Sequence, residues 1–201
     1  MTKKTTPIAR QASAFLPTKY GNFQISIYSA KKNALEQAVL TMGKIKKQPV
    51  LVRLHSQCFT GDTLLSLRCD CREQLIKSIK LISKNGSGVL IYLNQEGRGI
   101  GLTNKIKAYA LQEKHLDTIT ANQALHLPVD SREYKTAASI LKKLGIKKIN
   151  LITNNPDKIE QLEKNGITII KRIPIETKPN KFNKTYLITK KQKLGHKLTK
   201  V

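Results

Sequence analysis

A length of 201 residues is enough to bury a substantial core, 39% of the residues are hydrophobic, and the formal net charge is +24. No apolar run approaches the roughly 18 residues of a membrane-spanning helix, and no apolar segment follows the N-terminus, which argues against membrane and secreted classes. The lysines are scattered along the chain and there is no Trp, so diffuse surface charge is favoured over a dedicated nucleic-acid face. We therefore expect a cytoplasmic protein with no membrane partner.

Strand signals come first along the chain. Alternating apolar residues after a Tyr-Gly-Asn turn predict a strand over 23–28 that leaves a hairpin. Four further strands are predicted over 49–55, 88–93, 148–152 and 168–173. We expect the first fifty residues to be β-rich.

Helical signals alternate with these strands. Apolar residues at helical spacing predict helices over 74–83, 102–113, 131–144 and 156–164. Glycines that follow three of these segments predict where the helices end. The last twenty residues are basic and predict a loosely packed helix.

Strands that alternate with helices predict an α/β fold in which helices flank a mixed β-sheet. We expect a single domain over 1–201 with a β-rich N-terminal portion. Residues 1–14 and 196–201 are expected to be loosely ordered.

Three cysteines, Cys58, Cys69 and Cys71, lie in the spacing C-x10-C-x-C. In a chain without a secretory signal, clustered cysteines are more often metal ligands than disulfide partners. Three thiolates would leave a tetrahedral zinc ion one open position, which a catalytic zinc uses to activate water. The pattern therefore predicts a catalytic zinc site.

Two alternatives use the same residues. His55 could complete a closed structural site with the three cysteines, although its spacing matches no common zinc finger. The cysteines could also be buried free thiols, because Cys packs well in cores.

The loop Gln95-Glu-Gly-Arg-Gly-Ile-Gly101 joins a predicted strand to a predicted helix. Glycine N–H groups and an Arg side chain can bind an anion there, at the place where α/β folds usually bind ligands. The loop is neither a P-loop nor a dinucleotide fingerprint, and a plain tight turn would fit the same residues.

Asp130 and Glu133 fit the N-cap and capping box of the helix predicted over 131–144. Arg132 would be unfavourable in the first turn of that helix because of the helix dipole. An anion bound nearby would explain its position.

Six runs occur in order along the chain: Arg53-Leu-His-Ser-Gln-Cys58, Arg68-Cys-Asp-Cys71, Gln95-Glu-Gly-Arg98, Asn104-Lys-Ile-Lys-Ala-Tyr109, Asp130-Ser-Arg132 and Thr153-Asn-Asn-Pro156. Taken together, these runs resemble GTP cyclohydrolase II over roughly residues 16–195. That family opens the imidazole ring of GTP at C8, releasing formate and pyrophosphate, in the first step of riboflavin biosynthesis. The resemblance implies a hydrolase with one Zn²⁺ per subunit, Mg²⁺ on the triphosphate, a homodimeric state and no nucleic-acid partner.

The resemblance also implies roles for individual residues. The three cysteines would hold zinc, and Tyr109 would assist ring opening. Asp130 would accept a proton, and Arg132 would attack the α-phosphorus. Because a guanidinium normally has no free lone pair, Arg132 could instead stabilise charge on the phosphate. The implied GTP contacts are Arg53, Leu54, His55, Ser56, Gln57, Gln74, Glu96, Gly97, Arg98, Thr118, Thr153 and Lys158.

Two residues depart from the family pattern. Gln57 stands where the family usually has Glu, and Arg72 where it usually has Gly. A member with lost or altered activity is therefore an alternative, which turnover after a Gln57→Glu change would test. The family is often fused to a dihydroxybutanone phosphate synthase domain, for which 201 residues leave no room.

The charge motivates an alternative of another class, a basic zinc-stabilised nucleic-acid-binding protein. It would close its zinc site with His55, and its affinity would fall steeply with salt. The remaining histidines, His115, His126 and His196, have no ligand spacing and are expected to be surface or cap residues.

Overall fold

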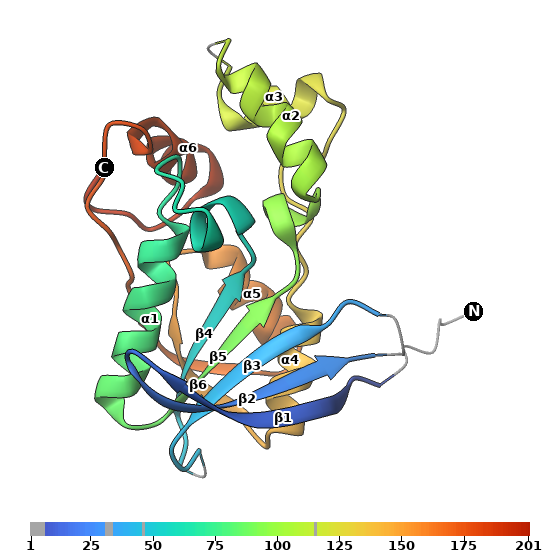
Figure 1. Ribbon diagram of the computed structural model, residues 1–201, viewed down its shortest axis with the longest axis vertical. Helices are drawn as coiled ribbons and strands as arrows, with labels where there is room; N and C mark the ends of the chain where they lie inside the picture. Colours follow the sequence, from blue (N-terminus) through green and yellow to red (C-terminus); the bar gives the residue numbers. More distant parts are fainter. Residues whose placement is uncertain (1–6, 31–33, 46, 115) are drawn as a thin grey trace.

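The computed structural model describes residues 7–30, 34–45, 47–114 and 116–201. One sheet has the strand order β1-β2-β3-β5-β4-β6-β7 (Figure 1). Neighbours from β1 to β5 are antiparallel, whereas β5, β4, β6 and β7 run parallel, so the sheet is mixed as predicted. The strands are β1 Ala9–Thr18, β2 Gly21–Ser29, β3 Gln37–Met42, β4 Val50–Ser56, β5 Gly88–Leu93, β6 Lys148–Ile152 and β7 Thr168–Ile173.

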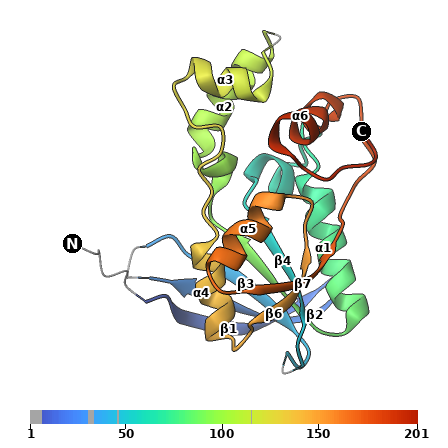
Figure 2. The same cartoon turned by 180° about the vertical axis from the view of Figure 1, so that it is seen from behind.

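Helices flank the sheet on both faces, which confirms the predicted α/β class. α4 and α5 cover one face and α1 the other (Figure 2). The helices are α1 Cys71–Asn85, α2 Leu102–Gln112, α3 Thr118–Ala124, α4 Lys135–Lys143, α5 Pro156–Lys164 and α6 Lys184–Leu194. Two short helical turns, η1 Phe59–Thr63 and η2 Glu96–Gly99, follow β4 and β5.

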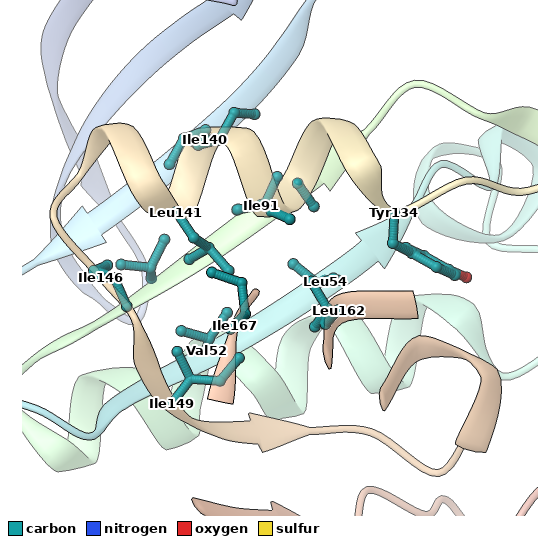
Figure 3. Packing of buried hydrophobic residues seen from close by; sticks show 14 of the residues in the cluster. Val52, Leu54, Ile91, Tyr134, Ile140, Leu141, Ile146, Ile149, Leu162 and Ile167 are labelled. Atoms are coloured by element: carbon teal, nitrogen blue, oxygen red, sulfur yellow. The ribbon is translucent and has the colours of Figure 1, made fainter. Parts of the chain in front are cut away.

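The central strands are apolar on both faces because both faces are covered. Val52 and Leu54 of β4 pack with Leu141 of α4 and Leu162 of α5 (Figure 3). On the opposite face, Ile82 of α1 packs in the second cluster of buried side chains. This double packing fixes the carboxyl ends of β4 and β5, from which the site is built.

The five predicted strands are all present, and so are the helices predicted over 74–83, 102–113 and 156–164, with small shifts at the ends. Sequence patterns missed β1, β3 and α3. Residues 9–14, expected to be loosely ordered, belong to β1, while residues 1–6 lie outside the described ranges. β1 gave no clear signal because most of its side chains are exposed, so its sequence shows no regular alternation of apolar and polar residues.

The C-terminal segment packs more closely than expected. α6 buries Leu187 and Lys190, and the Lys197 N–H donates to the Asn154 carbonyl at 2.9 Å. The Lys200 N–H donates to the Glu176 carboxylate at 3.0 Å. These contacts tie residues 196–201 to the segments after β6 and β7.

The capping prediction for α4 is wrong. The helix begins at Lys135 with Tyr134 in the N-cap position, so Asp130 does not cap it. The preceding residues are held elsewhere, because the Ser131 N–H donates to the Arg98 carbonyl at 3.0 Å. Arg132 therefore lies in an irregular segment beside the glycine-rich loop.

Within the described ranges, no helix combines the length and the hydropathy that crossing a bilayer requires.

Candidate active site

A cavity of about 470 Å³ opens where β4, β5 and β6 end, the usual ligand position in α/β sheets. Its walls bring together side chains from α1, α2, α5 and α6 and from the loops after the three strands. Among the described residues, the acidic side chains that line the cavity are Glu96 and Asp117. The cationic lining residues are Arg53, Arg68, Arg98, Lys105, Arg132, Lys158 and Lys190. Such a wall favours an anionic ligand carrying several charges.

The three cysteines meet at one part of this cavity. Cys58 follows β4, and Cys71 is the first residue of α1. All three Sγ atoms lie within 4.8 Å of one another, and the Cys58 and Cys69 sulfurs are 3.6 Å apart. Among the described residues, no His, Asp or Glu ligand atom joins this group. The cluster could bind a metal ion and leave one coordination position free.

Gly61 keeps the space beside the sulfurs open. A Cβ added to it would lie 2.7 Å from the Cys69 sulfur and 3.1 Å from that of Cys58. The turn η1 therefore brings backbone against the cluster where no side chain fits. This close fit suits an ion coordinated by three thiolates.

His55 is engaged away from the sulfurs. Its Nε2 lies 3.0 Å from the Asp62 carboxylate, and its ring stacks on Tyr92 at 5.4 Å. Burial lowers the pKa of His55, so the ring is neutral near pH 7 and donates to Asp62. The same carboxylate accepts bonds from the Cys58 N–H and the Tyr92 hydroxyl. This arrangement argues against a structural site closed by His55.

A lysine lies against the first cysteine. Lys105 Nζ is 3.2 Å from the Cys58 sulfur and 2.7 Å from Glu96 Oε1. Hydrogen bonds from Cys69 and Cys71, together with the Lys105 cation, hold the pKa of Cys58 well below its usual range. Cys58 is therefore a thiolate at neutral pH, the form that binds metal.

The glycine-rich loop presents Arg98 to the cavity. Gly97 and Arg98 have φ of 62° and 61°, a conformation that is strained for an arginine. The Arg98 backbone is fixed by Ser131, whose N–H and hydroxyl both donate to its carbonyl. Within the described ranges, Arg98 Nη1 and Nη2 are buried without a hydrogen-bond partner. An anion in the cavity would satisfy them.

Two more cations are buried at the strand ends. Arg53 donates to Gln74 Oε1 at 2.8 Å, and Lys158 donates to the Leu54 carbonyl at 2.7 Å. Burial lowers the pKa of Arg53 to about 10. Burial and the neighbouring Arg53 cation lower the pKa of Lys158 well below its usual value. Buried cations that repel one another are stabilised when an anion enters.

Arg132 and Asp130 form an ion pair, with Arg132 Nε 2.8 Å from Asp130 Oδ1. Burial alone would lower the pKa of Arg132, but Tyr134 and the Asp130 carboxylate raise it above its usual value. Arg132 lines the cavity, whereas Asp130 does not line it and contacts the Arg132 guanidinium through its carboxylate. The guanidinium is therefore protonated and available for ionic contacts.

The remaining residues of the expected site are not all in the cavity wall. Tyr109 and Thr153 line it, whereas the Leu54 side chain lies in the core and only its carbonyl reaches Lys158. Thr118 is the first residue of α3, and its side chain is outside the described part of the structure. The other expected contacts that line the cavity are Arg53, His55, Ser56, Gln57, Gln74, Glu96, Gly97, Arg98 and Lys158.

The sequence comparison decides the family. A family model described as GTP cyclohydrolase II matches residues 9–174, more than half of the chain. The chain belongs to the GTP cyclohydrolase II family.

Individual members of the GTP cyclohydrolase II family agree with this assignment. The chain is 53% identical to the riboflavin biosynthesis protein RibBA of Aquifex aeolicus over 196 residues, covering 96% of this chain and 48% of that protein. It is 50% identical to the GTP cyclohydrolase-2 of Picrophilus torridus and 52% identical to that of Buchnera aphidicola, in each case over 92% of this chain and 96% of the relative. The chain spans about half the length of the RibBA relatives it matches.

Some cavity residues of this GTP cyclohydrolase II family chain gave no signal in the sequence. Lys190 is one lysine among many, and Tyr186 lies in a helix without a clear apolar face. Lys105 lies in the Asn104–Tyr109 run that carries the family resemblance, but no role was assigned to it from the sequence. His196 was expected at the surface or in a cap but lines the cavity, whereas His126 is exposed. His115 lies outside the described residues.

The structure also places Arg72, one of the two departures from the family pattern. Its guanidinium donates to the Asp62 carbonyl at 2.9 Å, and it is not among the residues that line the cavity. The other departure, Gln57, does line it. Arg72 therefore braces the turn after Cys58 and adds no cation to the cavity.

We predict that Gly61→Ala lowers the content of bound transition metal to less than about a tenth, because the new methyl group would press on two of the sulfurs. Elemental analysis of the purified chain measures this. Gly145→Ala is the control, since it also adds a methyl group but one that meets nothing within 4 Å, and its φ of 73° adds backbone strain that Gly61→Ala does not carry. Full metal content in the Gly61→Ala variant would contradict the role given to Gly61.

Proposed function

We propose that the chain is a zinc-dependent GTP cyclohydrolase II, which opens the imidazole ring of GTP at C8 and releases formate and pyrophosphate to leave a diaminopyrimidine ribosyl phosphate. The observation that carries this proposal is the group of three cysteines in the wall of a strongly cationic cavity. Family membership supports the same activity. This reaction would be the first step of riboflavin biosynthesis.

The donor set fits zinc. Cys58, Cys69 and Cys71 supply three thiols, Gly61 leaves them room, and Lys105 favours the thiolate form of Cys58. A zinc ion bound there would supply a Lewis acid that activates water near neutral pH. The nearby Asp62 carboxylate holds the Cys58 backbone in place by accepting its N–H.

The cations of the cavity would bind the triphosphate, which we expect to carry Mg²⁺. Arg98 is the cation best placed to bind a phosphate, because its terminal nitrogens are buried without hydrogen-bond partners in the described structure. Lys158 and Arg53 would be stabilised by the same negative charge. The polar residues near the cysteines, among them His55, Gln57 and Gln74, would contact the rest of the nucleotide, and so would Ser56, Glu96, Gly97, Thr118, Thr153 and the Leu54 backbone.

Two further residues would act on protons and charge. Burial raises the pKa of Tyr109 to about 12, so its hydroxyl keeps its proton at neutral pH and can donate a hydrogen bond to the opening ring. Arg132, protonated and paired with Asp130, is better suited to stabilising charge on the α-phosphate than to attacking it. We therefore propose charge stabilisation for Arg132, with Asp130 positioning it.

We also propose that the chain forms one domain and assembles as a homodimer in the cytoplasm, as the family resemblance implies. Light scattering that gives the mass of one chain would reject the dimer. The engagement of His55 with Asp62 argues against the four-ligand zinc site that the nucleic-acid-binding alternative requires.

We predict that the zinc-loaded chain converts GTP in the presence of Mg²⁺ to formate, pyrophosphate and a diaminopyrimidine product. A chelator should abolish turnover, and added Zn²⁺ should restore it. Cys58→Ser should lose more than roughly a hundredfold in rate, since even outer partners of a metal site cost about 10–100-fold. Leu35→Ala, exposed and away from the cavity, is the control. No turnover by the fully zinc-loaded chain would reject the proposed activity.

We predict that Arg132→Ala slows pyrophosphate release by about a hundredfold or more, as expected when a donor to developing charge is removed. Arg132→Lys should keep a measurable part of the rate, because a cation remains. Quenched-flow analysis of pyrophosphate measures both variants, and intact-mass spectrometry during turnover checks for a nucleotide attached to the chain. A covalent adduct at Arg132 would instead support the nucleophile role.

A further inference from the structure

α6 forms part of the cavity wall although it lies beyond residue 174, the last residue that the family model matches. Figures 1 and 2 place this helix at the end of the sheet to which the β4 arrow points. Five residues from α6 and the segment just after it line the cavity, namely Thr185, Tyr186, Thr189, Lys190 and His196. The cavity is therefore completed by a segment to which neither the sequence motifs nor the family match gave a role.

A buried ion pair fastens α6 to the cysteine cluster. Lys190 Nζ lies 2.9 Å from Asp70 Oδ1, and the two side chains are 11% and 2% exposed. Asp70 stands between two of the cysteines in sequence, and its other oxygen accepts a bond from Gln74. Gln74 in turn accepts a bond from Arg53 of β4. One continuous chain of polar contacts thus links α6, α1 and β4.

The same helix touches the glycine-rich loop through an aromatic ring. The Tyr186 ring centroid lies 4.3 Å from Lys190 Nζ and 5.7 Å from the Arg98 guanidinium carbon. Among the described residues, Arg98 Nη1 and Nη2 have no hydrogen-bond partner. The contact that α6 makes with this guanidinium is the one with the Tyr186 ring. A cation over an aromatic face is held without using its N–H donors, which stay free for a ligand.

We propose that Tyr186 is a positioning residue that holds the Arg98 guanidinium ready for the phosphates of GTP, and that the Lys190–Asp70 pair keeps α6 where Tyr186 can do this. This inference rests on the proposed function, because GTP supplies the phosphates. Tyr186 acts through Arg98 and takes no part in bond breaking. Its loss should therefore weaken binding of the phosphates more than it slows the chemical step.

The test compares Tyr186→Leu with Tyr186→Phe in the full zinc-loaded chain. Tyr186→Leu removes the ring face and should raise KM for GTP by about tenfold, with kcat within about twofold, in line with a partly desolvated cation–π contact. The affinity for inorganic tripolyphosphate should fall by a similar factor, while the affinity for guanosine should stay the same. Tyr186→Phe keeps the ring face and should restore both values.

A second variant tests the fastening of α6. Lys190→Met leaves the Asp70 carboxylate buried without its cation, so α6 should open more readily. Hydrogen exchange should speed up at α6 amides and stay unchanged in β5 and α4, and KM for GTP should rise as in Tyr186→Leu. Wild-type exchange at α6 would overturn this part of the inference whatever the KM, because Lys190 also lines the cavity and its loss could raise KM directly.

The outcomes separate the two proposals. If the wild-type chain turns over GTP and Tyr186→Leu has the same KM and the same tripolyphosphate affinity, the positioning role is wrong and the proposed function stands. An equal loss of guanosine and tripolyphosphate affinity would show that Tyr186 shapes the cavity as a whole, which also overturns its role on Arg98. If the zinc-loaded wild-type chain neither binds nor opens GTP, the proposed function fails and this inference fails with it.

Discussion

The structure depends on how positive charge is balanced around the carboxyl ends of β4, β5 and β6. Several lysines and arginines line one cavity, and many of them are held by neutral groups or shared carboxylates. Lys158 rests on a backbone carbonyl, Arg53 on an amide, and Arg98 has no partner for its terminal nitrogens in the described structure. Burying charge in this way is unfavourable unless an anion completes the balance. The packing of the central strands keeps these charged side chains buried although their burial is unfavourable in free energy.

Two carboxylates organise the rest of the site. Asp62 accepts bonds from His55, Tyr92 and the Cys58 N–H, so it orients both the end of β4 and one of the clustered cysteines. Glu96 joins the glycine-rich loop to Lys105 and to the Phe59 N–H. Outer groups of this kind fix ligand geometry and tune the metal that the ligands bind. The cysteine cluster is therefore part of a larger hydrogen-bonded unit.

Local patterns predicted the features that depend on nearby residues. The cysteine spacing brought three sulfurs together as expected, and the apolar runs of β4 and β5 gave the central strands. The α4 capping prediction failed because the Ser131 N–H pairs with the Arg98 carbonyl, a partner 33 residues away in sequence. The Lys190–Asp70 pair spans 120 residues, and a single lysine among many carries no local signal for it. Sequence reasoning therefore found the cysteine cluster and missed the part of the cavity wall that α6 forms.

The position of α6 in the chain bears on how the cavity is made during synthesis. The strands, the three cysteines and the glycine-rich loop all precede α6, so they are synthesised before Tyr186 and Lys190. The anion pocket is thus completed by the part of its wall that is synthesised last.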